Sequence, residues 1–349
     1  MSSKTSNLRL GILDQSPVRE GGTPADAFAE TIELAQAAER FGYHRYWLAE
    51  HHGTDGLAGP APEIMVTRVA AATSDIRVGA GGVMLSHYSP YKVAETFRVL
   101  ETLYPGRIDL GIGRAPGSDG RTAQALAYGS QIGIEYFPNK IQDLTAFLTD
   151  TLPDNHPFAG LRATPATPST PEVWLLGSSN GSATYAAQFG LALSFAHFIA
   201  PRGGEAVVEA YRESFKPSAL YPEPVASIGV FALCAETDEA AQRLGASRDL
   251  WRLRVERGYH GPVPSPEEAL AYDYTAAERA RIEANRERSI IGTPDAVTAR
   301  IEELAASFAV DEVVVLGICY EFEARLRSYE LLAEAFGLAA RTAPARAAS

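Results

Sequence analysis

The chain has 349 residues, of which 46% are hydrophobic and 21% are charged, and its formal net charge is −12 at pH 7. These values are typical of an ordinary folded protein, and a surface this acidic argues against nucleic acid and anionic membranes as partners. Cys234 and Cys319 each lie inside an apolar run, which predicts small core residues and supports neither a disulfide framework nor a zinc site.

The first residues, Met1–Asn7, are polar, and no uninterrupted apolar run approaches the length of a membrane span. We therefore expect a cytoplasmic enzyme with no membrane partner.

Short apolar runs alternate with helix-like segments along most of the chain. The clearest helix start is Thr23-Pro24, because threonine can cap a helix, proline fits its first position, and Asp26 suits its N-terminal dipole. Gly42 ends this helix. The strands expected in chain order are 8–13, 44–49, 76–85, 107–113, 172–176, 191–196, 225–235 and 312–316. The expected helices are 24–41, 62–73, 90–104, 121–127, 139–151, 181–189, 204–215, 238–257 and 322–336.

Eight strands alternating with helices favour an α/β fold of the (β/α)8 barrel type over an open doubly wound sheet. We expect a single domain over residues 1–338 and a flexible tail at 339–349. The longest insertion, residues 258–291, lies between strands seven and eight and is rich in Pro, Tyr, Arg and Glu. Such a segment is either a lid over the barrel mouth or a solvated helical hairpin, and the sequence leaves both readings open.

Polar residues and glycines occur at four strand ends, and the carboxyl ends of barrel strands meet at one face. Glu50–His52 follows the second strand, Gly79–Gly82 lies in the third, Arg114 follows the fourth, and the turn Gly177–Ser182 opens the helix after the fifth. Free N–H groups and hydroxyls at that turn suit a phosphate, and an arginine would supply its charged partner. The glycines leave room for a flat group. The residues alone therefore predict a phosphorylated ligand with a flat part and a histidine near its reactive edge.

Each of these features has a structural alternative. The Gly177–Ser182 turn is also typical of a capped helix start. Arg114 could pair with Asp109 or Asp119 and not with a ligand. A metal held by the two adjacent histidines is disfavoured, because neighbouring residues on an extended segment point apart, so no metal site is expected.

Several stretches, in order along the chain, are together more selective than any single glycine motif. They are GYHRYWLAEHH, VGAGGVML, YPGRIDLGIGRAPGSD, PEVWLLGSSNGSATYAAQFGL and EVVVLG. This set resembles the bacterial luciferase-like family of flavin-dependent monooxygenases.

The resemblance implies a TIM barrel that binds FMN as FMNH2, supplied by a separate flavin reductase. With O2, it would oxidise a small organic substrate through a C4a-peroxyflavin; aromatic and polyketide-like molecules are candidates. Many relatives are homodimers, so a homodimer is expected. F420-dependent hydride-transfer oxidoreductases share the superfamily and remain an alternative. A non-catalytic flavin-binding subunit is another, although Glu50–His52 beside an intact phosphate cradle argues against it.

The resemblance also assigns residues. His51 falls on the active-site histidine, expected to act as a general base with a pKa near the working pH. The cofactor contacts are expected at Gly81, Gly82, Arg114, Ser178, Ser179 and Ser182. The arginine and serines would hold the phosphate, and the two glycines would form a non-prolyl cis peptide under the isoalloxazine ring. Ser178 lies where luciferase itself has an acidic residue.

Substrate contacts are expected near the strand ends. The candidates are Met84, His87, Tyr88, Phe195, His197 and Phe198, although packing at the barrel rim would explain each equally well. Glu50 and His52 are expected to orient the site. Gly113 stands where luciferase has its reactive cysteine, so the resemblance does not imply light emission with a long-chain aldehyde.

Overall fold

The computed structural model of the protein describes residues 8–115, 119–129 and 133–339. Within these ranges nine strands form one sheet, and all of its strand pairs are parallel. The strands are β1 Arg9–Asp14, β2 Arg45–Leu48, β3 Arg77–Met84, β4 Ile108–Gly113, β5 Glu172–Gly177, β6 Ala192–Ala196, β7 Ala226–Cys234, β8 Ser289–Gly292 and β9 Glu312–Leu316. The Pro116–Ser118 part of the fourth-strand motif and the predicted tail beyond Ala339 lie outside the described residues.

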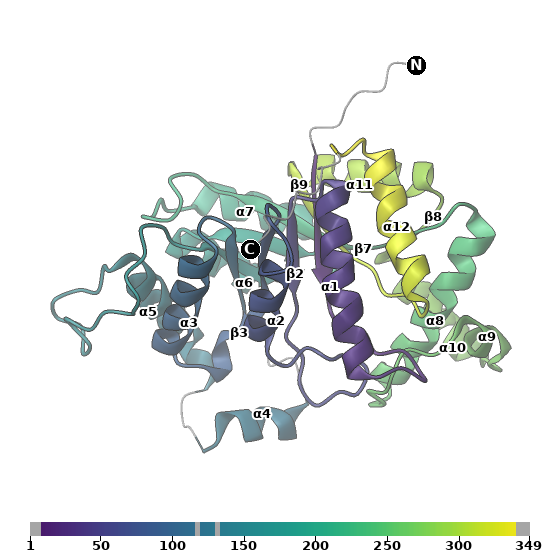
Figure 1. Ribbon diagram of the computed structural model, residues 1–349, viewed down its shortest axis with the longest axis horizontal. Helices are drawn as coiled ribbons and strands as arrows, with labels where there is room; N and C mark the ends of the chain where they lie inside the picture. Colours follow the sequence, from purple (N-terminus) through teal and green to yellow (C-terminus); the bar gives the residue numbers. More distant parts are fainter. Residues whose placement is uncertain (1–7, 116–118, 130–132, 340–349) are drawn as a thin grey trace, which may run out of the picture.

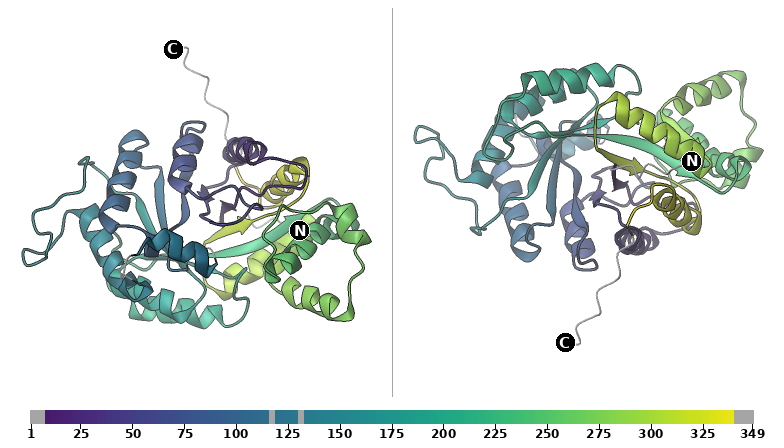
Figure 2. Two further views of the ribbon diagram at one scale, coloured as in Figure 1. Left: turned by 90° about the horizontal axis from the view of Figure 1, so that it is seen from below. Right: turned by 90° about the horizontal axis from the view of Figure 1, so that it is seen from above.

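Eight of these strands close into a barrel. β1 to β6 pair in chain order, β6 pairs with the start of β7, β7 pairs with β9, and β9 pairs with β1. Both views in Figure 2 show helices surrounding the strands. The predicted (β/α)8 TIM barrel is therefore confirmed. The sequence pattern does not predict the additional strand β8, which pairs with Phe231–Cys234 at the end of β7.

Helices follow most strands and cover the outside of the barrel (Figure 1). They are α1 Pro24–Phe41, α2 Pro62–Ala70, α3 Pro90–Leu103, α4 Gly120–Ala127, α5 Phe137–Thr149, α6 Asn180–Phe189, α7 Gly204–Ser214, α8 Asp238–Glu256, α9 Pro266–Ala271, α10 Ala276–Arg286, α11 Pro294–Ser307 and α12 Phe322–Ala335, with short 3₁₀ turns η1 Leu85–His87 and η2 Ile134–Tyr136. The predicted start of α1 is confirmed, since Thr23 and Asp26 form a reciprocal capping box. Gly42 ends α1 with a φ of 88°, a conformation that favours glycine.

The insertion at residues 258–291 holds α9, α10 and most of β8. Figure 1 shows α9 and α10 beside α8, at the lower right of the molecule. Ion pairs tie α10 to α8: Arg281 lies 2.7 Å from Glu256, and Arg286 lies 2.6 Å from Asp249. The insertion is thus a helical segment anchored on the helix that precedes it. The sequence pattern also misses α11, although its start, Thr293-Pro294-Asp295, resembles that of α1.

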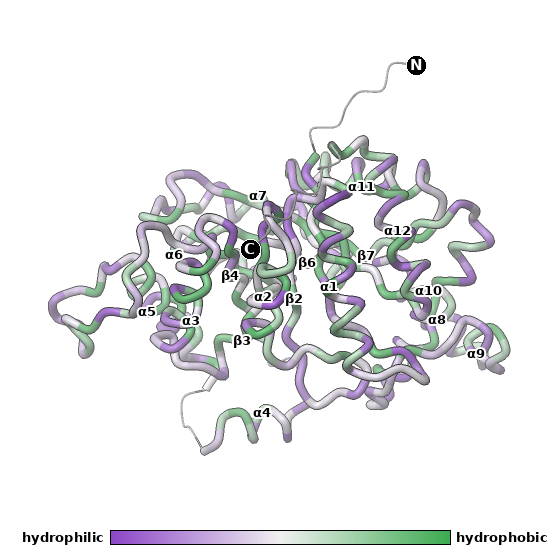
Figure 3. Tube along the Cα trace, in the orientation of Figure 1, coloured by the Kyte–Doolittle hydropathy of each residue, from purple (hydrophilic) through white to green (hydrophobic). Residues whose placement is uncertain are grey.

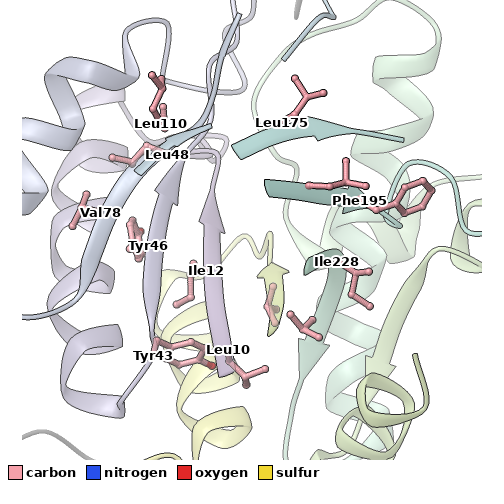
Figure 4. Close-up of a cluster of buried hydrophobic side chains, with 14 of the residues drawn as sticks. Leu10, Ile12, Tyr43, Tyr46, Leu48, Val78, Leu110, Leu175, Phe195 and Ile228 are labelled. Carbon is pink, nitrogen blue, oxygen red and sulfur yellow. The ribbon is translucent and has the colours of Figure 1, made fainter. Parts of the chain in front are cut away.

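The main hydrophobic core lies between the strands and the surrounding helices. Figure 4 shows Leu10, Tyr46 and Val78 on one side of the barrel and Phe195 and Ile228 on the other, all members of this cluster. In Figure 3 the central strands are mostly hydrophobic, whereas hydrophilic residues gather on the outer helices and loops. Burial of these apolar side chains is the main force that holds the helices on the barrel.

A second cluster, which includes Trp47, Trp174 and Phe231, is formed by the alternate residues of the same strands and fills the barrel interior. At the amino ends of the strands, Arg45 is 1% exposed. Its guanidinium lies 2.5 Å from the Asp109 carboxylate, 4.7 Å from the Trp174 ring centroid, and also pairs with Glu312. This network closes the amino end of the barrel, so space for a ligand lies at the carboxyl end.

Candidate active site

Two adjoining cavities open where the barrel strands end. The first, of about 550 Å³, is bordered by residues after β2, β3, β4 and β5; we call it the glycine-lined cavity. The second, of about 440 Å³, is bordered by α8 and the insertion; we call it the arginine-lined cavity. Gln15, His51, Phe198 and Ile199 border both. All six residues predicted to contact a cofactor line the glycine-lined cavity: Gly81, Gly82, Arg114, Ser178, Ser179 and Ser182.

The start of α6 forms one end of the glycine-lined cavity. Ser179 occupies the N-cap position in an extended conformation, but its side chain makes no capping hydrogen bond. Its hydroxyl and the first N–H groups of α6 therefore remain available for an anion. Ser182 approaches the chain so closely that a Cβ at Gly177 would lie 2.1 Å from its hydroxyl oxygen. Glycine at position 177 thus leaves room for the Ser182 hydroxyl at this end of the cavity.

Arg114 lies beside this helix start. A Cβ added at Gly181 would be 3.8 Å from both Arg114 Nη1 and the Ser179 hydroxyl, so the guanidinium and the hydroxyl flank the same turn. The structural alternatives for Arg114 are not what is found. Asp109 pairs with Arg45 and Arg77, and no salt bridge joins Arg114 to any described residue.

Asp119, the other suggested partner of Arg114, caps α4. Its carboxylate accepts hydrogen bonds from the backbone N–H groups of Arg121 and Thr122, at 2.8 and 2.9 Å. A cation without a protein partner next to an uncapped helix start is an arrangement suited to a phosphate.

The Gly81–Gly82 peptide bond is cis, as the family resemblance implies. A Cβ at Gly81 would lie 2.8 Å from Leu13 and Trp47, and one at Gly82 would lie 2.7 Å from the backbone of Gly111. At Gly113 a Cβ would meet no atom within 4 Å. The strands therefore present a surface with few side chains, beside the indole of Trp47, against which a planar group can lie.

His51 stands between the two cavities. Its backbone N–H donates to the Gly59 carbonyl at 3.0 Å, and its Nδ1 is buried with no hydrogen-bond partner among the described residues. Burial, with a smaller contribution from His52, lowers the pKa of His51 to about 4. The imidazole is therefore neutral at neutral pH, which differs from the expectation of a pKa near the working pH.

The physical reason is burial of the imidazole, and Glu50, the nearest carboxylate in sequence, hydrogen-bonds other groups. Glu50 is 2% exposed, and it bonds the His52 ring at 2.7 Å, the Tyr88 hydroxyl at 2.7 Å and the Met84 backbone N–H at 2.9 Å. Glu50 is thus bound to groups other than His51. These contacts tie the ends of β2 and β3 together, which fits the orienting role expected of Glu50 and His52.

The predicted substrate residues separate into two groups. Met84 lines the glycine-lined cavity, and Phe198 lines both cavities. His87, Tyr88, Phe195 and His197 border neither cavity. Phe195 packs against Phe308 on the helix side of the barrel, with ring centroids 5.7 Å apart, and Figure 4 shows its ring among the residues of the main core. Because side chains alternate along a strand, Ser194 and Ala196 face the cavity in its place.

His197 is 3% exposed, and its ring lies 6.2 Å from that of Phe308. The Tyr88 hydroxyl is held by Glu50. These residues therefore contribute to the packing of the barrel rim, and we do not assign them to substrate.

Sequence reasoning missed the residues that build the arginine-lined cavity. They come mainly from one face of α8 and from the insertion: Arg248, Trp251, Arg252, Val255, His260 and Arg288. The first four recur at spacings of three and four residues, which places them on one face of a helix. That periodicity was the available signal, since a basic and aromatic stripe on a barrel helix is unusual for a purely structural face.

The described residues contain no group of three or more His, Cys, Asp or Glu side chains that could hold a metal ion. Across the same described ranges, no helix combines the length and the apolar character needed to cross a membrane.

The fold and site together define a TIM barrel with ligand cavities at the carboxyl ends of its strands. Residues 8–312 match the family described as luciferase-like monooxygenase. An uncharacterised protein of Bacillus subtilis, YceB, is 50% identical over 94% of this chain and 99% of its own length. The N-acetyl-S-alkylcysteine monooxygenase of the same organism is 39% identical, covering 94% of this chain and 98% of its own.

Among solved structures, apo-MsnO8 is 40% identical and superposes with a TM-score of 0.89, covering 96% of this chain and 100% of its own. The chain therefore belongs to the luciferase-like monooxygenase family.

Proposed function

We propose that this protein is a two-component monooxygenase that uses reduced FMN and O2 to oxidise a small organic substrate. The observation that carries the proposal is one cavity that combines three features. These are the cation Arg114, which has no salt bridge among the described residues and lies beside the uncapped start of α6, the side-chain-poor surface at Gly81–Gly82, and the neutral imidazole of His51. The first suits a phosphate, the second a planar ring, and the third a proton acceptor.

The residues present fit FMN. Arg114 would pair with the phosphate, and the hydroxyls of Ser178, Ser179 and Ser182 with the N–H groups of α6 would complete its shell. The ring system would lie over Gly81–Gly82 near Trp47. A volume of about 550 Å³ lies within the ordinary range of small-molecule sites. Bound reduced FMN would supply the electrons by which one oxygen atom enters the substrate and the other leaves as water.

His51 would act on protons. Its pKa of about 4 keeps the imidazole neutral, so one ring nitrogen is free to accept a hydrogen bond or a proton. Its Nδ1 has no partner among the described residues, which leaves that atom free to do so. The cost of charging a buried imidazole makes any proton it takes easy to return.

The substrate would occupy the arginine-lined cavity, which meets the flavin site at His51 and Phe198. The aromatic side chains Phe198, Phe231 and Trp251 in its wall support an aromatic or otherwise apolar substrate portion. Because one relative acts on N-acetyl-S-alkylcysteine, small thioethers belong among the compounds tested first.

The insertion would limit the access of water to this cavity. His260 and Arg288, at its two ends, border the arginine-lined cavity, and salt bridges hold α10 on α8. Its role as a cover therefore needs no large movement, and exclusion of water would protect the reduced flavin from unproductive oxidation.

Two partners are part of the proposal. A separate reductase would supply FMNH2, and a second copy of the chain would complete a homodimer. The neighbouring helices α2 and α3 carry the exposed apolar side chains Ile64, Val99 and Leu103, at 65%, 45% and 56% exposure, which supports association through this face. Analytical ultracentrifugation tests the dimer, and a mass near 37.4 kDa would exclude it.

The proposed function is tested by supplying enzymatically reduced FMN and ¹⁸O-labelled O2 with a panel of thioethers and aromatic compounds. Incorporation of one labelled atom into a product, dependent on the protein, is the expected result. If reduced F420 supports turnover without oxygen uptake, the protein is a hydride-transfer enzyme. If flavin binds and no oxygen is consumed beyond the rate of free FMNH2, the protein is a binding subunit.

A further inference from the structure

Arg248 on α8 is a buried cation that has no salt-bridge partner in the part of the chain that the structure describes. It is 7% exposed, and its Nη1 has no hydrogen bond. No salt bridge or hydrogen bond joins any atom of this guanidinium to the residues that the structure describes. The guanidinium stacks on an aromatic ring, since its Cζ lies 3.9 Å from the Phe231 ring centroid.

This arrangement is costly without a ligand. A buried charge is normally paired, because desolvation penalises the ion and contact with an aromatic face offsets only part of that penalty. Burial lowers the pKa of Arg248 to about 10, which leaves the side chain charged at neutral pH. The adjacent Asp249 forms no salt bridge with it: Asp249 Oδ2 lies 2.6 Å from Arg286, and Oδ1 has no hydrogen-bond partner among the described residues.

The surroundings add positive charge. Arg252 and Arg288 line the same cavity, and each has a partner outside it: Arg252 lies 3.2 Å from Glu256, and Arg288 bonds Asn285. The acidic residue in the lining, Asp119, directs its carboxylate to the start of α4. The cavity therefore presents one unpartnered guanidinium in a positive field, beside the apolar surfaces of Phe231 and Trp251.

We propose that the arginine-lined cavity binds a small organic acid, whose carboxylate pairs with Arg248 and whose apolar part extends toward His51. This assignment rests on the proposed function, since it names the class of substrate that would meet the flavin. A planar guanidinium matches a carboxylate with two parallel hydrogen bonds. One arginine in mid-helix, without a partner among the described residues, fits one carboxylate better than a doubly charged phosphate.

A purely structural role is the competing explanation. Arg248 would then serve only to cover Phe231, and the charge of the ligand would not matter. The two explanations differ in what they predict for pairs of ligands that have the same shape and different charge.

The test is isothermal titration of the full-length protein, with and without oxidised FMN, using matched acids and primary amides. Suitable pairs are phenylacetate with phenylacetamide, 3-phenylpropanoate with its amide, and hexanoate with hexanamide. We expect at least one acid to bind about tenfold or more tightly than its amide, as a charge-assisted pair implies. If no acid in the panel exceeds its amide, the proposal is overturned, whether or not either compound binds.

Variants then locate the effect. Arg248→Gln should abolish the preference for the acid and leave amide binding unchanged. Arg243→Gln is the matched control, because Arg243 lies on the same helix, pairs with Glu267 and Glu321, and borders neither cavity. A preference that survives in Arg248→Gln would overturn the assignment.

Two further measurements cover the remaining outcomes. If Arg248→Gln does not fold, a crystal structure of the unchanged protein with the tightest acid decides the question, since a carboxylate bound away from Arg248 would overturn the proposal. FMN affinity is measured in parallel on every variant. Absence of an acid preference in the unchanged protein, with FMN binding intact, refutes this inference alone, whereas absence of FMN binding refutes the proposed function.

Discussion

Removing the charge of Arg114 gives a prediction whose magnitude can be worked out from the structure. The side chain is exposed, and it makes no salt bridge within the described parts of the chain. Substitution by alanine therefore leaves no buried group unpaired, and the fold should keep its stability. What is lost is a single charge-assisted contact to phosphate, worth about 1.5–3 kcal/mol. Because exposure to solvent weakens such contacts, we expect the lower end, about a tenfold loss of FMN affinity.

The assay compares two flavins that differ only in the phosphate. Arg114→Ala should weaken FMN by about tenfold and change riboflavin binding by less than about twofold, measured by quenching of flavin fluorescence. Arg121→Ala is the control, since Arg121 is an exposed cation nearby in the chain that borders neither cavity. Equal weakening of FMN and riboflavin, or an unchanged affinity for FMN, would refute the phosphate assignment.

Three other predictions follow from the geometry. The His51→Gln variant should bind FMN normally and lose most oxygenation. As pH drops from 6.5 to about 4, the free energy of unfolding should decrease in both proteins, and the decrease should be smaller in the variant than in the unchanged protein. The sign follows from burial: in this window the unfolded chain takes up the proton and the folded chain does not, which costs about 2–3 kcal/mol in the unchanged protein. Arg325 lies 2.5 Å from the buried Asp14 carboxylate, so Arg325→Met should cost about 3–5 kcal/mol in urea denaturation because it leaves that carboxylate without its charged partner. Arg327→Met on the same helix, with its side chain 40% exposed, should cost less than about 1 kcal/mol. Replacing residues 266–286 with a short linker should raise peroxide release per flavin oxidised and leave FMN affinity unchanged.

Each has a clear contrary outcome. Turnover retained in His51→Gln would remove this residue from the reaction, and an acid sensitivity equal to that of the unchanged protein would show that His51 is not the buried neutral group. Similar losses of stability in Arg325→Met and Arg327→Met would mean that the pair with Asp14 does not stabilise the fold. Unaltered coupling after shortening of the insertion would show that it does not shield the flavin.

The barrel could be predicted from sequence because its signals are local. Short apolar runs ended by glycine or proline mark the eight barrel strands, and cap residues such as Thr23 mark helix starts. The missed helices carry cap residues, as α11 does at Thr293-Pro294, but two of the missed elements lack the hydrophobic pattern. β8 has only Ile290 and Ile291 as its apolar residues, and α10 is dominated by Arg and Glu, so neither shows a clear hydrophobic period.

The site was predictable where it depends on strand ends. The resemblance placed Arg114, Gly81–Gly82 and the serines after β5, and the structure brings all of them to one cavity. The position of Phe195 near a strand end does not show which way its side chain points. A shift of one residue along the strand moves a side chain from the cavity to the core.

Two properties depend on contacts between parts of the chain that are far apart in sequence. The low pKa of His51 depends on its burial, with a smaller contribution from His52. The arginine-lined cavity joins strand ends to α8 and the insertion, which are distant from them along the chain. The strand ends and α8 come together around this cavity only when the barrel is closed.

The measurement that tests the central claim most directly is the reoxidation of reduced FMN on the protein. FMN is photoreduced anaerobically with an excess of protein, air is admitted, and flavin absorbance is followed over time. Binding in a water-poor cavity beside His51 predicts that reoxidation differs in rate and course from that of free FMNH2, and that Arg114→Ala shifts it toward the free behaviour. Reoxidation indistinguishable from that of free FMNH2 at saturating protein would contradict the account.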